Sequence, residues 1–143
     1  MSAHEEIGNL MNAYCYAIDS GDFLTFAQLF ANAEWIAEGQ RPSKESADNL
    51  IIYDDGTPKT KHVISNIRID IDENETSAKA HSYVTVWQAT ADFPLQAIFV
   101  GDYFDSFEKV DGRWRFTRRE IRNSLVGDMT AHLKVPSLTI PSA

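Results

Sequence analysis

The hydrophobic positions follow helical spacing near the N-terminus and strand-like alternation in the second half of the chain. Residues 4–19 carry apolar side chains three and four positions apart, which predicts a helix with one buried face. A Ser-Gly pair at positions 20–21 ends this pattern, and Asp22 can cap a second helix over residues 23–30. Because the connection is so short, the two helices are expected to pack as a hairpin.

A short strand over residues 33–38 and a third helix, capped by Ser43 and running to about Tyr53, are predicted next. Beyond residue 59, stretches rich in Val, Tyr, Thr and Trp predict four long strands. These strands cover residues 60–72, 76–90, 95–109 and 113–124. Their connections are short, so the strands are expected to form a sequential antiparallel meander.

Helices followed by strands form a segregated α+β pattern. The predicted fold is therefore three N-terminal helices packed on a strongly curved antiparallel sheet, an α+β barrel or cone. The space between the helices and the sheet is a natural apolar pocket. With 143 residues and no internal repeat, the chain is expected to be one domain, residues 1–143, in which residues 125–143 form a C-terminal tail.

The charge and the cysteine content narrow the possible partners and the compartment. A net charge of −8 disfavours nucleic acids and anionic membranes as partners. No apolar run reaches the roughly 18 residues of a membrane-spanning helix, and the acidic N-terminus does not resemble a secretory signal. Cys15 is the single cysteine, which excludes an intramolecular disulfide and fits a reducing compartment. We therefore expect a cytoplasmic protein that binds neither nucleic acid nor membrane.

Asp19 lies just inside the C-terminal end of the first helix, where the helix dipole disfavours a negative charge. Either the carboxylate is solvated at a fraying helix end, or a partner elsewhere in the chain compensates it. His62, near the start of the first long strand, is a candidate general base, with a core histidine satisfied by a backbone carbonyl as the alternative. A carboxylate bonded to one imidazole nitrogen would fix the tautomer and stabilise the imidazolium, so Asp19 and His62 are a candidate dyad.

Tyr14 and one arginine of the last strand could complete such a site. The Tyr14 phenol could donate a hydrogen bond to a developing oxyanion, or it could be a core tyrosine. The arginines of the last strand are expected to pair with acidic residues on the strand before it. These acidic residues are Asp102, Asp105 and Glu108. Arg118 and Arg119 have opposite strand parity, and alternation alone leaves open which of them faces the pocket.

The four histidines, at positions 4, 62, 81 and 132, lack metal-ligand spacing, so no metal site is expected. His81 is expected on the outer face of the sheet, because the small and apolar residues at positions 80, 82, 84 and 86 suit a crowded inner face. His132 lies in the tail and could belong to an interface or a lid.

A set of short motifs runs along nearly the whole chain. They are Tyr14-x-x-x-x-Asp19 with Gly21-Asp22, Leu29-Phe30, Glu34-Trp35, His62-x-x-x-Asn66, Ser82-Tyr83, Gly101-x-Tyr103-x-Asp105, the stretch from Asp111 to Phe116, and His132. In this order and spacing they resemble the SnoaL-like branch of the nuclear transport factor 2-like (cystatin-like cone) superfamily. The nearest group is that of bile acid 7α-dehydratase, scytalone dehydratase and hexachlorocyclohexane dehydrochlorinase.

The resemblance implies a cofactor-independent lyase that acts on a hydrophobic cyclic small molecule by dehydration or β-elimination. It assigns the general base to His62 and its support to Asp19, with Tyr14 and Arg119 stabilising the developing charge. The substrate-binding residues that it implies are Trp35, Asn66, Val84 and Tyr103. In one departure from the family pattern, Thr85 stands near the place where some dehydratases carry a further acidic residue. Relatives of this kind usually self-associate, so a homo-oligomer, a dimer or trimer, is expected.

The superfamily also contains other activities, and two alternatives stay open. One is an isomerase or epoxide hydrolase of the same fold, and the other is a non-catalytic ligand-binding or assembly subunit. The position of Asp19 distinguishes an enzyme from a non-catalytic subunit. In a non-catalytic subunit, its carboxylate is expected to point away from His62 or to lie more than about 4 Å from it.

Overall fold

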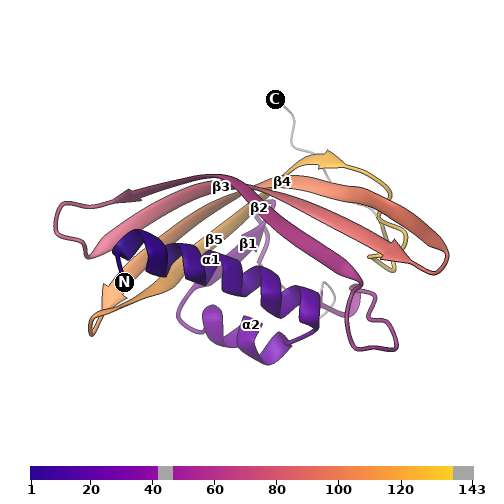
Figure 1. Cartoon of the computed structure of the whole chain (residues 1–143), viewed down its shortest axis with the longest axis horizontal. Coiled ribbons are helices and arrows are strands. Elements are labelled where there is room, and N and C mark those ends of the chain that lie inside the picture. Colours follow the sequence, from indigo (N-terminus) through magenta and orange to yellow (C-terminus); the bar gives the residue numbers. More distant parts are fainter. Residues whose placement is uncertain (42–46, 137–143) are drawn as a thin grey trace.

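Two helices and one five-stranded sheet make up the fold in the computed structural model, which describes residues 1–41 and 47–136 (Figure 1). Helix α1 spans Ala3–Ser20 and helix α2 spans Phe23–Leu29. The strands are β1 (Glu34–Ala37), β2 (Thr60–Ile71), β3 (Ser77–Thr90), β4 (Phe93–Val110) and β5 (Arg113–Val126). Strands β2 to β5 pair antiparallel in sequence order, which confirms the predicted meander.

The sheet is curved, as predicted, but it is open and does not close into a barrel. Its strand order is β1-β5-β4-β3-β2, and β1 pairs with β5 in parallel. Strand β1 has only four residues and lies at the edge opposite β2. Both helices lie on one face of this open sheet (Figure 1).

The predicted third helix is wrong over residues 49–53, whereas residues 47–48 are helical. Residues 43–46 lie outside the described ranges. Further along, Leu50 forms a β-bridge with Leu133, and the Ile51 N–H donates to the carbonyl of His132 at 2.9 Å. These bonds use backbone groups that a helix would need, so the chain is not helical at residues 50 and 51. It runs here beside its own C-terminal region.

Gly21 ends α1 for two physical reasons. Its φ of 73° is left-handed, a conformation that glycine adopts without strain. A Cβ at this position would also lie only 2.0 Å from the carbonyl oxygen of Gly56. Asp22 then caps α2, its side chain accepting the Thr25 N–H at 3.1 Å. The break therefore fixes the end of α1, which carries Asp19, against the loop that leads into β2.

Bulges in two strands change which residues face the helices. In β2 the register with β3 shifts between Ser65 and Arg68, where Asn66 has a φ of 52°. In β5 the register with β4 shifts at Thr117, so Phe116 and Arg119 are both buried although they are three positions apart. Each bulge inserts one unpaired residue and so reverses the alternation beyond it.

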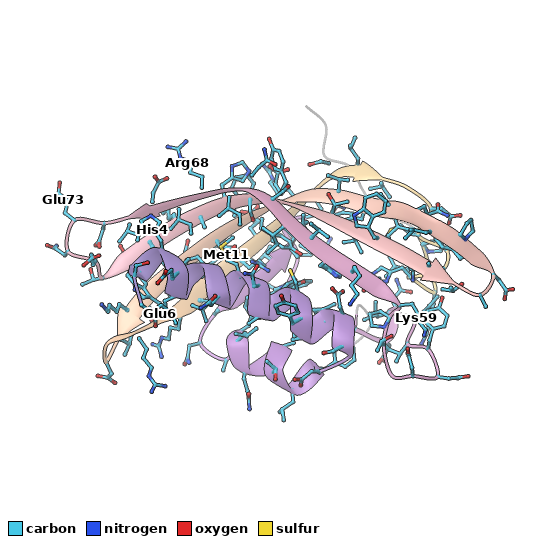
Figure 2. All side chains as sticks on the ribbon, viewed as in Figure 1. His4, Glu6, Met11, Lys59, Arg68 and Glu73 are labelled. Carbon is cyan, nitrogen blue, oxygen red and sulfur yellow. The ribbon has the colours of Figure 1, made fainter. Side chains whose placement is uncertain are left out.

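The core lies between α1 and the sheet. Met11 of α1 is fully buried there, whereas Arg68 projects from the opposite face of the sheet (Figure 2). Alternate residues of β3, from Ala78 to Val86, are at most 5% exposed, which confirms the expected inner face and places His81 on the outer one. Neither described helix combines the length and the apolarity needed to cross a membrane.

Candidate active site

His62 and Asp19 form a buried pair at the end of α1. The His62 Nδ1–H donates to Asp19 Oδ1 at 2.6 Å, and each side chain is only 9% exposed. The Asp19 carboxylate also accepts the His62 backbone N–H at 2.7 Å and the Thr60 hydroxyl at 2.9 Å. Three donors from the first residues of β2 therefore hold a carboxylate that belongs to α1.

These donors compensate the unfavourable position of Asp19 at the C-terminal end of a helix. Burial would raise the pKa of the Asp19 carboxyl, but the hydrogen bonds from His62 and Thr60 and the His62 charge lower it below its ordinary value. Asp19 is therefore ionised at neutral pH and acts only as an acceptor. In the neutral form of His62, the Nδ1 proton is held toward Asp19, so the Nε2 lone pair can accept a proton.

Arg119 is fully buried and belongs to a second ion pair. Its Nε and Nη2 donate to the two carboxylate oxygens of Asp105 at 2.7 and 2.8 Å, and both side chains are 0% exposed. Burial alone would lower the pKa of the guanidinium, but the Asp105 carboxylate outweighs this effect and raises it, so Arg119 is a permanent cation. Its third nitrogen, Nη1, has no hydrogen-bond partner among the described residues.

Tyr14 connects the two ion pairs. The Arg119 guanidinium carbon lies 4.4 Å from the ring centroid of Tyr14 and 3.9 Å from that of Tyr103. The Tyr14 ring also meets the His62 ring edge-on, with centroids 6.2 Å apart. Burial raises the pKa of the Tyr14 phenol, and the Arg119 charge opposes the rise only in part. The phenol therefore keeps its proton and can donate a hydrogen bond.

Residues 1–120 match the SnoaL-like domain family. The chain belongs to the SnoaL-like family. This finding confirms the resemblance that the motif order predicted. A search among curated proteins finds no match.

Solved structures of similar fold agree with the family assignment. A Novosphingobium aromaticivorans protein, provisionally assigned as a scytalone dehydratase, is 28% identical with a TM-score of 0.67, and the match covers 87% of this chain and 86% of that one. LinA is 19% identical with a TM-score of 0.64, covering 97% and 95% of the two chains. An NTF2-like protein with a cystatin-like fold, also from N. aromaticivorans, is 18% identical with a TM-score of 0.67, covering 90% and 85%.

The four residues that the resemblance predicts to be catalytic lie in one group linked by contacts, from Asp19 through His62 and Tyr14 to Arg119. Three of the four residues expected to bind substrate adjoin it. Trp35, Val84 and Tyr103 belong to the same hydrophobic cluster as Tyr14. Asn66 does not join the group, because it is exposed on the bulge of β2, where the strand alternation breaks.

Two residues of the group had weaker signals in the sequence. Thr60 shares strand parity with His62 and lies two positions before it, so strict alternation could have placed it beside Asp19. Asp105 was expected to pair with an arginine across the strands, but its burial with Arg119 depends on the bulge in β5. His132 lies in a tail without hydrophobic periodicity, so its place in the fold could not be predicted from the sequence.

A surface cavity of about 390 Å³ opens at the end of the sheet and reaches this group at Asp19. Its lining includes Thr60, Gln88 and Trp87, together with the polar loop that carries Lys59. His62, Tyr14 and Arg119 are not part of this lining. The cavity is thus more polar than the enclosed apolar pocket predicted from the sequence, and it approaches the dyad from one end.

Proposed function

We propose that this SnoaL-like protein is a cofactor-independent lyase that removes a proton from carbon in a hydrophobic cyclic small molecule. The observation that carries the proposal is the 2.6 Å bond from His62 Nδ1 to a buried, ionised Asp19. This arrangement leaves His62 Nε2 as the basic atom and provides a negative charge to stabilise the imidazolium. The two groups come from α1 and β2, rigid elements that preorganise the pair.

The reaction proposed is a β-elimination. His62 Nε2 takes a proton from the carbon next to an electron-withdrawing group, the C–H electron pair forms the carbon–carbon double bond, and the leaving group departs from the β-carbon. For a leaving hydroxyl, the proton held by His62 can return to the departing oxygen, so that water is released and the imidazole is neutral again. A positioned base of this kind contributes about 10²–10⁴-fold to the rate.

Tyr14 and Arg119 support this chemistry as a source of positive potential. Negative charge develops on the substrate as the proton leaves carbon, and preorganised donors or cations stabilise such charge in a water-poor site. The Tyr14 phenol carries a proton, and Arg119 keeps one nitrogen without a partner in the described structure. Asp105 holds the guanidinium in place through two bonds and prevents its rotation.

The family and the 28% identical scytalone dehydratase-like neighbour support a lyase. An isomerase would use the same base and return the proton to another carbon, which makes it the second candidate. The 2.6 Å distance between His62 Nδ1 and Asp19 Oδ1 disfavours a non-catalytic subunit, for which a separation of more than about 4 Å is expected.

We further propose that the protein works in the cytoplasm as a homo-oligomer, a dimer or trimer. The outer face of the sheet carries exposed large side chains that include Tyr83, Trp87 and Phe104. Such a group is typical of an interaction surface. Sedimentation equilibrium of the purified protein would give the number of copies, and a monomer at micromolar concentration would contradict this part.

Product mass distinguishes the candidate reactions. Cyclic β-hydroxy ketones, steroid enones and aryl epoxides would be incubated with the wild-type protein and with His62→Ala, and the products analysed by mass spectrometry. A lyase gives loss of water from a β-hydroxy ketone that His62→Ala does not catalyse. An isomerised enone of unchanged mass would favour the isomerase, and full turnover by His62→Ala would overturn the mechanism.

A further inference from the structure

Residues 129–135, here called the C-terminal strap, are bound along their length to the chain's own core. The Lys134 N–H donates to the carbonyl of Asn49 at 2.8 Å, and the Tyr53 hydroxyl donates to the carbonyl of Ala131. From strand β3, Gln88 Nε2 donates to the same Ala131 carbonyl at 3.0 Å. The strap is therefore a fixed wall at the end of the sheet where His62 and Asp19 lie.

His132 lies in the middle of this strap. The backbone of His132 is satisfied, since its N–H donates to the Met129 carbonyl at 3.0 Å and its carbonyl accepts the Ile51 N–H. Its imidazole is different, because Nδ1 is buried and has no hydrogen-bond partner among the described residues. A buried polar nitrogen without a partner is destabilising, so it calls for a physical explanation.

The dyad acts on His132 electrostatically. Burial and, to a smaller extent, the His62 charge together lower the pKa of the His132 imidazole to about 4, against an opposing effect of Asp19. His132 is therefore neutral at pH 7 and carries one N–H and one lone pair. A neutral imidazole can hydrogen-bond to an uncharged oxygen without exchanging a proton with it.

Gln88 adds a second unpartnered atom next to the strap. Its Nε2 donates both to Pro58 and to Ala131 carbonyls, at 3.0 Å each, which fixes the orientation of the amide. Its Oε1 is left buried and without a partner in the described part of the chain, although the side chain is only 1% exposed. Gln88 and Asp19 also line the same cavity of about 390 Å³, so a molecule in that cavity lies close to both.

We infer that Gln88 and His132 form a polar subsite that binds a hydroxyl group of the substrate beside the His62–Asp19 pair. A hydroxyl is both donor and acceptor, so it can donate to Gln88 Oε1 and accept from the neutral imidazole of His132. This inference rests on the proposed function and narrows it to hydroxylated cyclic substrates. A purely apolar or halogenated ring would leave both atoms without partners and is disfavoured.

Binding of two matched bicyclic probes tests the subsite without turnover. The dissociation constants of 2-tetralol and of tetralin, which lacks the hydroxyl, would be measured for the wild type, His132→Phe and His132→Gln. The wild type is expected to prefer 2-tetralol by about 100-fold, roughly tenfold for each of the two hydrogen bonds. His132→Phe is expected to lose about tenfold of this preference, because the bond to Gln88 remains, and His132→Gln, which keeps a hydrogen-bonding amide, is expected to lose less.

The matched control is His4→Gln, which changes an exposed histidine at the start of α1 (Figure 2) and is expected to leave the preference intact. Equal affinity of the wild type for the two probes, no binding of either, or an unchanged preference in His132→Phe would overturn the subsite. The His62→Ala variant separates this inference from the proposed function. If His62→Ala keeps the hydroxyl preference while the wild type turns over no substrate, the lyase proposal fails and the subsite stands.

Discussion

Among the described residues, two His–Asp pairs lie on opposite faces of one sheet. His62 meets Asp19 on the inner face, and His81 meets Asp102 on the outer face, both at 2.6 Å. The inner side chains are 9% exposed each, whereas those of His81 and Asp102 are 42% and 24% exposed. The same two residue types at the same distance therefore lie in two different dielectric environments.

The surroundings of the pairs differ as well. His81 stacks on Phe104 with ring centroids 4.5 Å apart, and Asp102 accepts the Ser124 hydroxyl at 2.9 Å, all within adjacent strands of the outer face. The inner pair joins α1 to β2 across 43 positions of sequence and lies against Tyr14. A His–Asp pair is thus a common structural contact, and only burial beside other charged and donor groups makes it suitable for acid–base chemistry.

Replacing the two aspartates separately gives the largest expected contrast. Asp19→Asn removes the charge that fixes the His62 tautomer, so turnover of a true substrate should fall by a factor on the order of 10⁴. Asp102→Asn should leave turnover within about twofold, because that pair touches solvent rather than the site. Steady-state kcat/KM values of both variants measure the contrast, and equal losses would remove the distinction between the two faces.

The buried Arg119–Asp105 pair is expected to give the largest loss of stability. Asp105→Asn leaves a fully buried guanidinium without its counterion, which should lower the free energy of unfolding by about 3–5 kcal/mol. The matched change Glu108→Gln, at the half-exposed pair with Arg115, should cost less than about 1 kcal/mol. Urea unfolding of the two variants provides the measurement, and a loss below about 1 kcal/mol for Asp105→Asn would contradict the buried pair.

Two glycines with left-handed φ allow a smaller comparison, Gly21 at the end of α1 and Gly112 in the turn between β4 and β5. Gly112→Ala, in a turn where an added Cβ meets nothing within 4 Å, should cost about 1 kcal/mol of backbone strain. Gly21→Ala adds a collision with the Gly56 carbonyl and should cost about 3 kcal/mol. Thermal unfolding distinguishes the two variants, and equal melting temperatures would show that the close approach at Gly21 does not constrain the end of α1.

The smallest expected effect is the change in the free energy of unfolding that the His62–Asp19 pair causes at acid pH. The folded pKa of Asp19 is lowered, so its stabilising contribution is present above the ordinary value of 3.8 and is lost as pH falls through the folded value. The difference in unfolding free energy between the wild type and Asp19→Asn should therefore shrink from about pH 5 to pH 2. Unfolding measured across that range checks the sign, and a difference that grows toward low pH would refute it.

The helices and strands of this fold follow from local patterns in the sequence. The places where the predictions fail depend on pairing between residues that are far apart in the chain. The helical hairpin and the meander were predicted within a few residues, because spacing, capping and short turns are local signals. The third helix was wrong because Leu50 and Ile51 bond to residues 132 and 133, which no local pattern reveals.

The site was predictable where motif spacing and alternation agreed. Asp19 and His62 were proposed as partners, and the structure places them 2.6 Å apart. Strand alternation could not choose between Arg118 and Arg119, because the bulge at Thr117 reverses the parity that alternation assumes. The bulge in β2 acts in the same way on Asn66, which was expected at the substrate and is exposed instead.

The most direct test of the proposed base compares the two histidines. His62→Gln and His81→Gln would be prepared side by side, and kcat/KM measured on a cyclic β-hydroxy ketone that the wild-type protein dehydrates. The inner-face mechanism predicts that His62→Gln loses about 10²-fold or more in kcat/KM, while His81→Gln stays within about twofold of the wild type. Full activity in His62→Gln, or an equal loss in both variants, would contradict the assignment of His62 as the base.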